Sequence, residues 1–304
     1  MHRWAVGLFL LLGLALAQNP QDFALRLEQA WRLVKERYYD PSFNGVDWEA
    51  VGQRYRQKLP GVQDWEGLYH LLDQMYAELG DDHSRVLSPA QAQRYLGAGG
   101  GRCLALPFQT PEPYQPPQVR FSEGVVVVRL QNLVERAGLE ALQEAIRRYE
   151  AQAVGYVLDL RGNPGGLALR MAEVAGVFLR GVPWRLVSRG LGAVPLPTVP
   201  FWGLPQTQKP LVVLIDGGVH SAAEGLAGAL KNAGRAYLIG TRSAGNTEAL
   251  TPYCFPDGGV ALVAGGVLAP LVGPTWEGRG VEPDLVVEDP AEQLEAALRY
   301  LKRP

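Results

Sequence analysis

The spacing of apolar and polar residues divides the chain into a helical first part and a second part in which strands and helices alternate. Apolar residues recur at helical spacing over residues 21–37, 48–59 and 65–79, which predicts three amphipathic helices. Asp47 and Asp64 directly precede the last two segments, and aspartate is a favoured N-cap residue. We therefore expect a small N-terminal helical domain over residues 18–94.

The second part, residues 119–304, alternates short apolar runs rich in β-branched residues with amphipathic segments. This alternation favours an α/β fold with a mostly parallel sheet covered by helices on both faces. Strands are expected at residues 124–130, 154–160, 183–189, 211–215, 236–239, 260–268 and 285–287. Helices are expected at residues 133–150, 167–179, 222–233 and 291–302. Residues 95–118 are rich in glycine and proline and predict a linker, with one strand at residues 102–106.

The first residues have the layout of a secretory signal peptide. A basic start at residues 1–3 precedes the apolar run Trp4–Leu14 and the small residues around Ala17. This order is typical of a leader cleaved after Ala17, and the run is short for a membrane span. We expect no transmembrane segment in the mature chain and a secreted or periplasmic location.

The composition of the 304 residues is that of an ordinary globular protein, with 47% hydrophobic and 20% charged residues. The net charge of −2 gives no reason to expect nucleic acid as a partner. Cys103 and Cys254 suit an oxidising compartment, and both a disulfide and two buried thiols are compatible with their positions. No His/Cys cluster has metal-binding spacing, and we expect neither a metal nor another cofactor.

The segment Pro210–Ala233 contains the strongest candidate for chemistry. A buried strand ends in Gly217-Gly218, and Ser221 then opens a helix. A serine at this position either caps the helix or acts as a nucleophile beside backbone N–H groups at a positive helix end. A second strand, over residues 154–160, ends in a glycine turn containing Gly165-Gly166. Both turns follow strands of one predicted parallel sheet, so we expect them at the same edge.

Four ordered motifs give the chain a resemblance to a known family. They are Asp159–Gly166, Gly217–Glu224, Gly234–Gly240 and Gly280–Asp284, preceded by Leu79–Ser84 in the helical part. Together they resemble the carboxyl-terminal processing peptidases, the tail-specific serine proteases of family S41. The resemblance implies a ClpP/crotonase-like spiral of β-β-α units, peptide or protein substrates, and peptide-bond hydrolysis through an acyl-enzyme. Many members carry a PDZ module, for which the segment between Ser84 and Val119 is too short.

By the same resemblance, Ser221 corresponds to the nucleophile, and the N–H groups of Gly166 and Ala222 correspond to the oxyanion hole. Asn246 stands where many members have a lysine base, and a neutral amide cannot accept the serine proton. The chain is closer to the tricorn-type branch, which implies that His83 is the base and Glu277 its carboxylate partner.

Asp82, Gly165 and Asn246 are possible supporting residues of this site. The alternatives are a structural role for His83, a solvated position for Glu277, and His220 as a rival base. The asparagine at position 246 also motivates a second hypothesis, a catalytically inactive protein that binds peptides or small ligands on the same fold. Acyl-CoA chemistry, known on related folds, fits poorly with a secretory leader.

Overall fold

The computed structural model describes residues 20–81, 83–96, 115–199 and 205–302. The predicted leader, the predicted strand at residues 102–106, Cys103 and Asp82 lie outside these ranges. Cys254 is disulfide-bonded. Within the described ranges, no helix is both long and apolar enough to cross a membrane.

The N-terminal helices form where the sequence predicts them. They are α1 (Pro20–Arg37), α2 (Trp48–Lys58) and α3 (Trp65–Ala77). The side chain of Asp47 accepts a hydrogen bond from the Ala50 N–H, and that of Asp64 accepts one from the Gly67 N–H. These bonds satisfy backbone donors that the first helical turn leaves free. Strand β1 (Arg85–Leu87) and helix α4 (Pro89–Leu96) follow.

A six-stranded sheet forms the core of the second part, in the order β11-β8-β7-β4-β3-β2. Its strands are parallel except β2, which runs antiparallel to β3. They are β2 (Gln118–Ser122), β3 (Val125–Arg129), β4 (Gly155–Asp159), β7 (Leu211–Ile215), β8 (Tyr237–Gly240) and β11 (Leu285–Val286). One face packs against α5 (Arg136–Tyr149), α6 (Ala168–Gly176) and α7 (Ala222–Asn232), and the other against α8 (Pro290–Leu301). The prediction of a parallel sheet covered on both faces is confirmed.

A second, antiparallel sheet was not predicted. Its order is β1-β10-β5-β6, and β9 pairs with β10. Its further strands are β5 (Trp184–Ser188), β6 (Gly192–Leu196), β9 (Glu248–Cys254) and β10 (Val260–Pro270). Strands β6 and β9 escaped prediction because each contains a proline, which disfavours a strand assignment away from edges. Part of β2 also falls at the end of the segment predicted as a linker.

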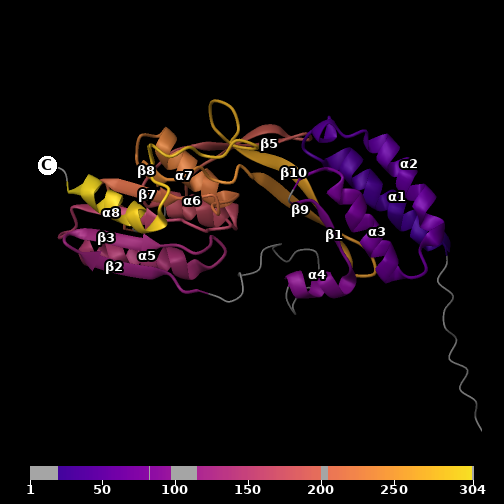
Figure 1. The fold of residues 1–304 in the computed structure, drawn as a ribbon, viewed down its shortest axis with the longest axis horizontal. Coiled ribbons are helices and arrows are strands. Elements are labelled where there is room, and N and C mark those ends of the chain that lie inside the picture. The colour runs from indigo at the N-terminus through magenta and orange to yellow at the C-terminus, as the bar shows by residue number, and fades with distance from the viewer. Residues whose placement is uncertain (1–19, 82, 97–114, 200–204, 303–304) are drawn as a thin grey trace, which may run out of the picture.

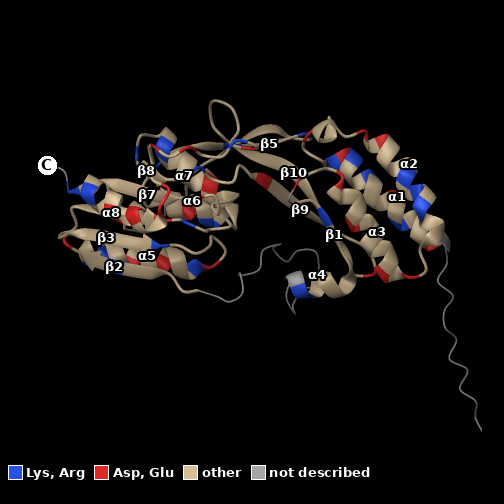
Figure 2. Ribbon diagram, in the orientation of Figure 1, with Lys and Arg blue, Asp and Glu red and all other residues tan. Residues whose placement is uncertain are grey.

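The hairpin of β9 and β10 connects the α/β part to the helical part (Figure 1). Phe255, Ala261, Val263 and Ala264 of this segment are buried in the same apolar cluster as the helices α1–α3. The turn is tied down by Asp257, which accepts hydrogen bonds from Arg26 at 2.7 Å and Tyr69 at 2.8 Å. The turn end of the hairpin is thereby held in a fixed relation to the N-terminal helices. Acidic and basic residues are interspersed along those helices (Figure 2).

Candidate functional site

Ser221 lies in a strained turn between β7 and α7. It is the N-cap residue of α7, with φ of 52° and ψ of −125°, a conformation that L-residues other than glycine rarely adopt. The Ser221 N–H donates to the Asn246 carbonyl at 2.8 Å, and the His220 N–H donates to the Asn163 carbonyl at 3.0 Å. Such strain persists only where neighbouring contacts hold it, and it sets Ser221 at the positive end of α7.

Glu224 joins this turn to the loop that follows β8. Its fully buried carboxylate accepts hydrogen bonds from the Ser221 N–H at 3.1 Å and the Asn246 N–H at 2.8 Å. It also accepts from the Ser243 hydroxyl and the Gly245 N–H, both at 2.6 Å. One side chain therefore fixes both segments, a role that the motif containing Glu224 did not indicate.

The glycine turn after β4 packs directly against Ser221. Gly165 has φ of 90°, and a Cβ atom at this position would lie 2.9 Å from the Ser221 Cβ. Gly166 has φ of 144°, and a Cβ there would lie 2.5 Å from the Leu133 carbonyl carbon. Both positions therefore require glycine. The N–H groups of Gly166 and Ala222 form no hydrogen bond with any other residue that the structure describes, so both remain available as donors.

Ser221, Ala222 and Gly166 line one cavity of about 230 Å³. Thr247 and Glu248 supply its polar side. The rest of the wall is apolar and consists of Ala168, Met171, Leu186, Leu196, Ala249, Leu250 and Leu268. An apolar pocket with a few polar groups beside a serine suits the side chain of a bound ligand.

His83 lies in the loop before β1 and contacts a carboxylate that lines the same cavity. Its Nδ1 is 2.9 Å from Oε2 of Glu248. The N–H groups of His83 and Ser84 both donate to Asp81, and the Ser84 hydroxyl accepts from the Ala264 N–H in β10 at 3.0 Å. Burial alone would lower the pKa of His83, but the hydrogen bond and charge of Glu248, with smaller contributions from Asp81 and Glu277, raise it overall.

The carboxylate that contacts His83 is therefore Glu248, whereas the resemblance implied Glu277. Glu277 instead accepts hydrogen bonds from the Thr247 N–H at 2.5 Å and the Thr247 hydroxyl at 2.9 Å. Burial and the neighbouring charge of Glu248 raise the pKa of Glu277 to about 7. One feature of the sequence does point to Glu248. It lies two residues after Asn246, the position at which many family members have a lysine base.

Asn246 lies at the site, whereas the lysine on the helix that Ser221 opens does not serve it. Asn246 is buried, and its backbone braces the Ser221 turn through the bonds described above. Lys231 lies on α7 and donates to the Glu282 carbonyl at 2.6 Å and to Asp284 at 3.0 Å, so its ammonium group is already engaged elsewhere. No group of three or more His, Cys, Asp or Glu side chains among the described residues could hold a metal ion.

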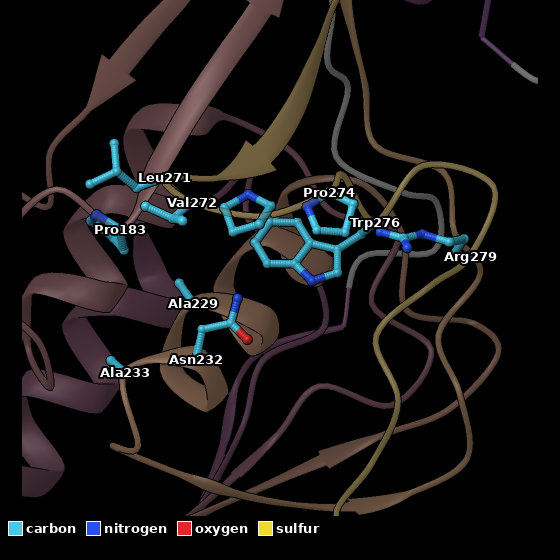
Figure 3. A pocket seen from close by; sticks show the side chains of 10 residues that line it. Pro183, Ala229, Asn232, Ala233, Leu271, Val272, Pro274, Trp276 and Arg279 are labelled. Carbon is cyan, nitrogen blue, oxygen red and sulfur yellow. The ribbon is translucent and has the colours of Figure 1, made fainter.

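A larger hollow of about 560 Å³ lies near the C-terminal end of α7 and contains none of these residues. Figure 3 shows Ala229, Asn232 and Ala233 on the helix, with Leu271 and Trp276 from the segment after β10. The Trp276 ring packs so closely on α7 that a Cβ at Gly228 would lie 2.4 Å from it. This contact anchors the segment that carries the adjacent Glu277.

Comparison with known proteins identifies the family. The family model described as Peptidase family S41 matches residues 124–287, and that of the Tricorn protease C1 domain matches residues 19–77. A carboxyl-terminal-processing protease of Picosynechococcus sp. is 25% identical, with 86% of this chain and 84% of the relative covered. A carboxy-terminal-processing protease of Bartonella bacilliformis is 37% identical over 177 residues, which cover 56% of this chain and 40% of that relative.

The fold agrees with these matches. The structure of a photosystem II D1 C-terminal processing protease superposes with a TM-score of 0.69 and 21% identity, covering 94% of this chain and 98% of that one. The predicted ClpP/crotonase-like α/β core with an N-terminal helical region is confirmed. Because the S41 model matches more than half of the sequence, the chain belongs to peptidase family S41 and is a serine peptidase of that family.

Proposed function

We propose that this chain is a secreted or periplasmic endopeptidase in which Ser221 is the nucleophile, His83 the general base and Glu248 the carboxylate that orients the imidazole. The observation that carries the proposal is the His83–Glu248 pair, because Glu248 lines the same cavity as Ser221. A carboxylate bonded to Nδ1 fixes the tautomer and leaves Nε2 as the proton acceptor.

In the proposed reaction, Oγ of Ser221 attacks the carbonyl carbon of the scissile peptide bond while Nε2 of His83 takes the hydroxyl proton. The N–H groups of Gly166 and Ala222 bind the oxyanion of the tetrahedral intermediate. His83 then gives the proton to the leaving amine. Water activated by the same histidine hydrolyses the acyl-enzyme and releases Ser221.

The substrate is proposed to be an extended peptide with an apolar side chain next to the scissile bond. The apolar wall of the cavity supports that preference. Strand β9 starts at this cavity, and among the described strands it pairs with β10. Its other edge offers backbone groups for pairing with a peptide strand. Pro252 lacks an N–H, so the pairing is expected to stop near Thr251.

The location outside the cytoplasm is likewise part of the proposal. Its supports are the leader-like layout of residues 1–17 and the disulfide at Cys254, because disulfides persist mainly in oxidising compartments. N-terminal sequencing of the protein isolated from its own cells checks it. A mature chain starting at Gln18 is expected, and a cytoplasmic protein retaining Met1 contradicts it.

The second candidate function is ligand binding without catalysis, which the asparagine at position 246 motivates. A fluorophosphonate probe, which reacts with activated serines, distinguishes the two. We expect labelling of the wild type but not of Ser221→Ala, and loss of labelling in His83→Ala. Asn246→Ala and the matched histidine control His220→Ala are expected to keep most of it.

Absence of labelling in folded wild-type protein between pH 6 and 9 would favour the binding protein. Full labelling of His83→Ala would exclude histidine as the base. Either result is independent of substrate choice, because the probe needs no peptide recognition.

A further inference from the structure

Two carboxyl groups lie side by side behind His83. Only 4% of the Glu248 side chain is exposed, and its Oε2 contacts the imidazole. Glu277 is close enough to Glu248 for a hydrogen bond between the two side chains and for their charges to interact. The residues come from β9 and from the segment after β10, so the β-hairpin and its continuation bring them together.

The surroundings of the two carboxyl groups supply little positive charge to compensate two negative charges. Among the described residues, Glu248 forms an ion pair with His83, and Glu277 forms none. Asp81, in the His83 loop, and Tyr39, after α1, also face this cluster, and burial together with the negative charges there raises the pKa of Tyr39. Adding a second full negative charge at this place is therefore unfavourable.

Two carboxyl groups in contact hold one proton between them over a wide pH range. Thr247 determines the arrangement, because its N–H and hydroxyl both donate to Oε2 of Glu277. The other Glu277 oxygen is left to share the proton with Glu248. In this state the pair carries one negative charge, which matches the single positive charge of an imidazolium.

We propose that Glu277 is a positioning residue that acts through Glu248, by sharing one proton with it and so fixing the net charge that His83 meets. The inference rests on the proposed role of His83 as base, and it assigns Glu277 a different role from that of a direct partner of the histidine. The charge of this carboxyl pair thereby determines the pKa of His83.

The pH dependence follows from this charge. Burial and Glu248 raise the pKa of Glu277 to about 7, so the shared proton is lost as the pH rises through neutrality. A second negative charge then favours the imidazolium and keeps His83 protonated to higher pH. Glu277→Gln preserves the size of the side chain and an acceptor for Thr247, but it never ionises. In this variant His83 is expected to release its proton at lower pH.

The experiment is an NMR titration of the histidine side chains, with the His83 signal assigned by its loss in His83→Gln. The pKa of His83 is expected to fall by about 0.5–1 unit in Glu277→Gln, because a nearby negative charge that favours the imidazolium is removed. The control Glu282→Gln removes an exposed carboxylate from the same segment and is expected to leave the titration unchanged. If Glu277→Gln does not fold, Thr247→Val offers a second route, because losing one donor to Glu277 extends the singly charged state to higher pH.

The pH profile of fluorophosphonate labelling adds the catalytic readout. In Glu277→Gln the ascending limb is expected to move down by the same 0.5–1 unit, and the plateau rate is expected to fall far less than in Glu248→Gln. In Glu248→Gln we expect the plateau itself to fall by about 10²–10⁴-fold, the range that a correctly oriented general base contributes. An unchanged His83 titration in Glu277→Gln, or a plateau lost as fully as in Glu248→Gln, overturns the inference. A wild type that is never labelled refutes the proposed peptidase instead, and the NMR titration still tests the carboxyl pair.

Discussion

Replacing Glu224 by glutamine is expected to weaken both the fold and the reactivity of Ser221. The carboxylate is fully buried and accepts four hydrogen bonds, from Ser221, Asn246, Ser243 and Gly245. A glutamine oxygen keeps two of these donors, but its NH₂ group faces the other two. The favourable orientation places the NH₂ near the Ser243 hydroxyl, which can rotate, and this leaves the Gly245 N–H without an acceptor.

The expected loss can be worked from these contacts. Hydrogen bonds to charged groups contribute about 1.5–3 kcal/mol each, and a buried unsatisfied donor costs about 1–3 kcal/mol. Since some of the four bonds survive with a neutral acceptor, we expect the free energy of unfolding to fall by about 3–5 kcal/mol. A typical domain has about 5–15 kcal/mol of stability, so a domain near the middle of that range remains folded at room temperature after this loss.

Urea unfolding followed by tryptophan fluorescence measures this loss, since the chain contains 7 tryptophans. Labelling by a fluorophosphonate in the absence of urea is expected to slow at least tenfold, because the Ser221 N–H loses the carboxylate that is one of its two hydrogen-bond acceptors. Glu144→Gln removes an exposed carboxylate on α5 and is expected to change stability by less than about 0.5 kcal/mol. An unfolding midpoint and labelling rate equal to the wild type in Glu224→Gln would refute the account of this side chain as the link between the two segments.

Four further predictions concern the oxyanion site, the base, for which there are two, and the cavity. Gly166→Ala places a Cβ 2.5 Å from backbone atoms of Leu133, so the turn must move, and we expect labelling of Ser221 to fall by about 10²–10³-fold, as for loss of one oxyanion donor; an unchanged rate contradicts the assignment. Because the pKa of His83 is raised above its usual 6.5, labelling is expected to rise with pH with a midpoint above 6.5, and a midpoint below 6 argues against His83. By the same shift, protonated His83 stabilises the fold fully below pH 6.5, and this contribution is lost as the pH rises through its folded pKa. The free energy of unfolding measured from pH 5 to 8 is expected to show this loss in the wild type but not in His83→Gln. Gly225→Ala puts a Cβ 2.3 Å from Leu268 and 2.7 Å from Met171, both in the cavity wall. KM is therefore expected to rise more for peptides with large apolar side chains than for peptides with alanine. Equal increases in KM for both kinds of peptide contradict the assignment of the cavity.

Local pattern was sufficient for the elements whose side chains repeat with a clear period. The helices at residues 20–37, 48–58 and 65–77 formed as predicted, because their apolar faces and aspartate caps are encoded within each segment. The buried strands β4 and β7 were likewise visible as apolar runs. Strand β9 was missed, since its Pro252 reads as a break and its pairing depends on β10.

The parts of the candidate site that lie within single turns of the chain could be predicted from the sequence. The Ser221 turn and the Gly165-Gly166 turn lie against each other, as expected for two turns at the carboxyl edge of one parallel sheet. The contact between His83 and Glu248 joins residues that are 165 positions apart. No local period encodes such a contact, and the resemblance pointed to Glu277 instead.

The sequence by itself determined the family, the helical and α/β parts, and the serine and glycine turns, because each depends on residues close together in the chain. Only the tertiary structure decided which carboxylate meets His83, how Glu224 links two loops, and that Glu248 and Glu277 adjoin. The Glu224 contacts form where α7 packs beside the loop after β8. The two contacts of Glu248 follow from the antiparallel sheet, in which the β9–β10 hairpin crosses from the α/β core to the N-terminal helices. The physical reason is that the sheet's hydrogen bonds and the apolar cluster around α1–α3 position the hairpin, and both form only when distant segments pack together.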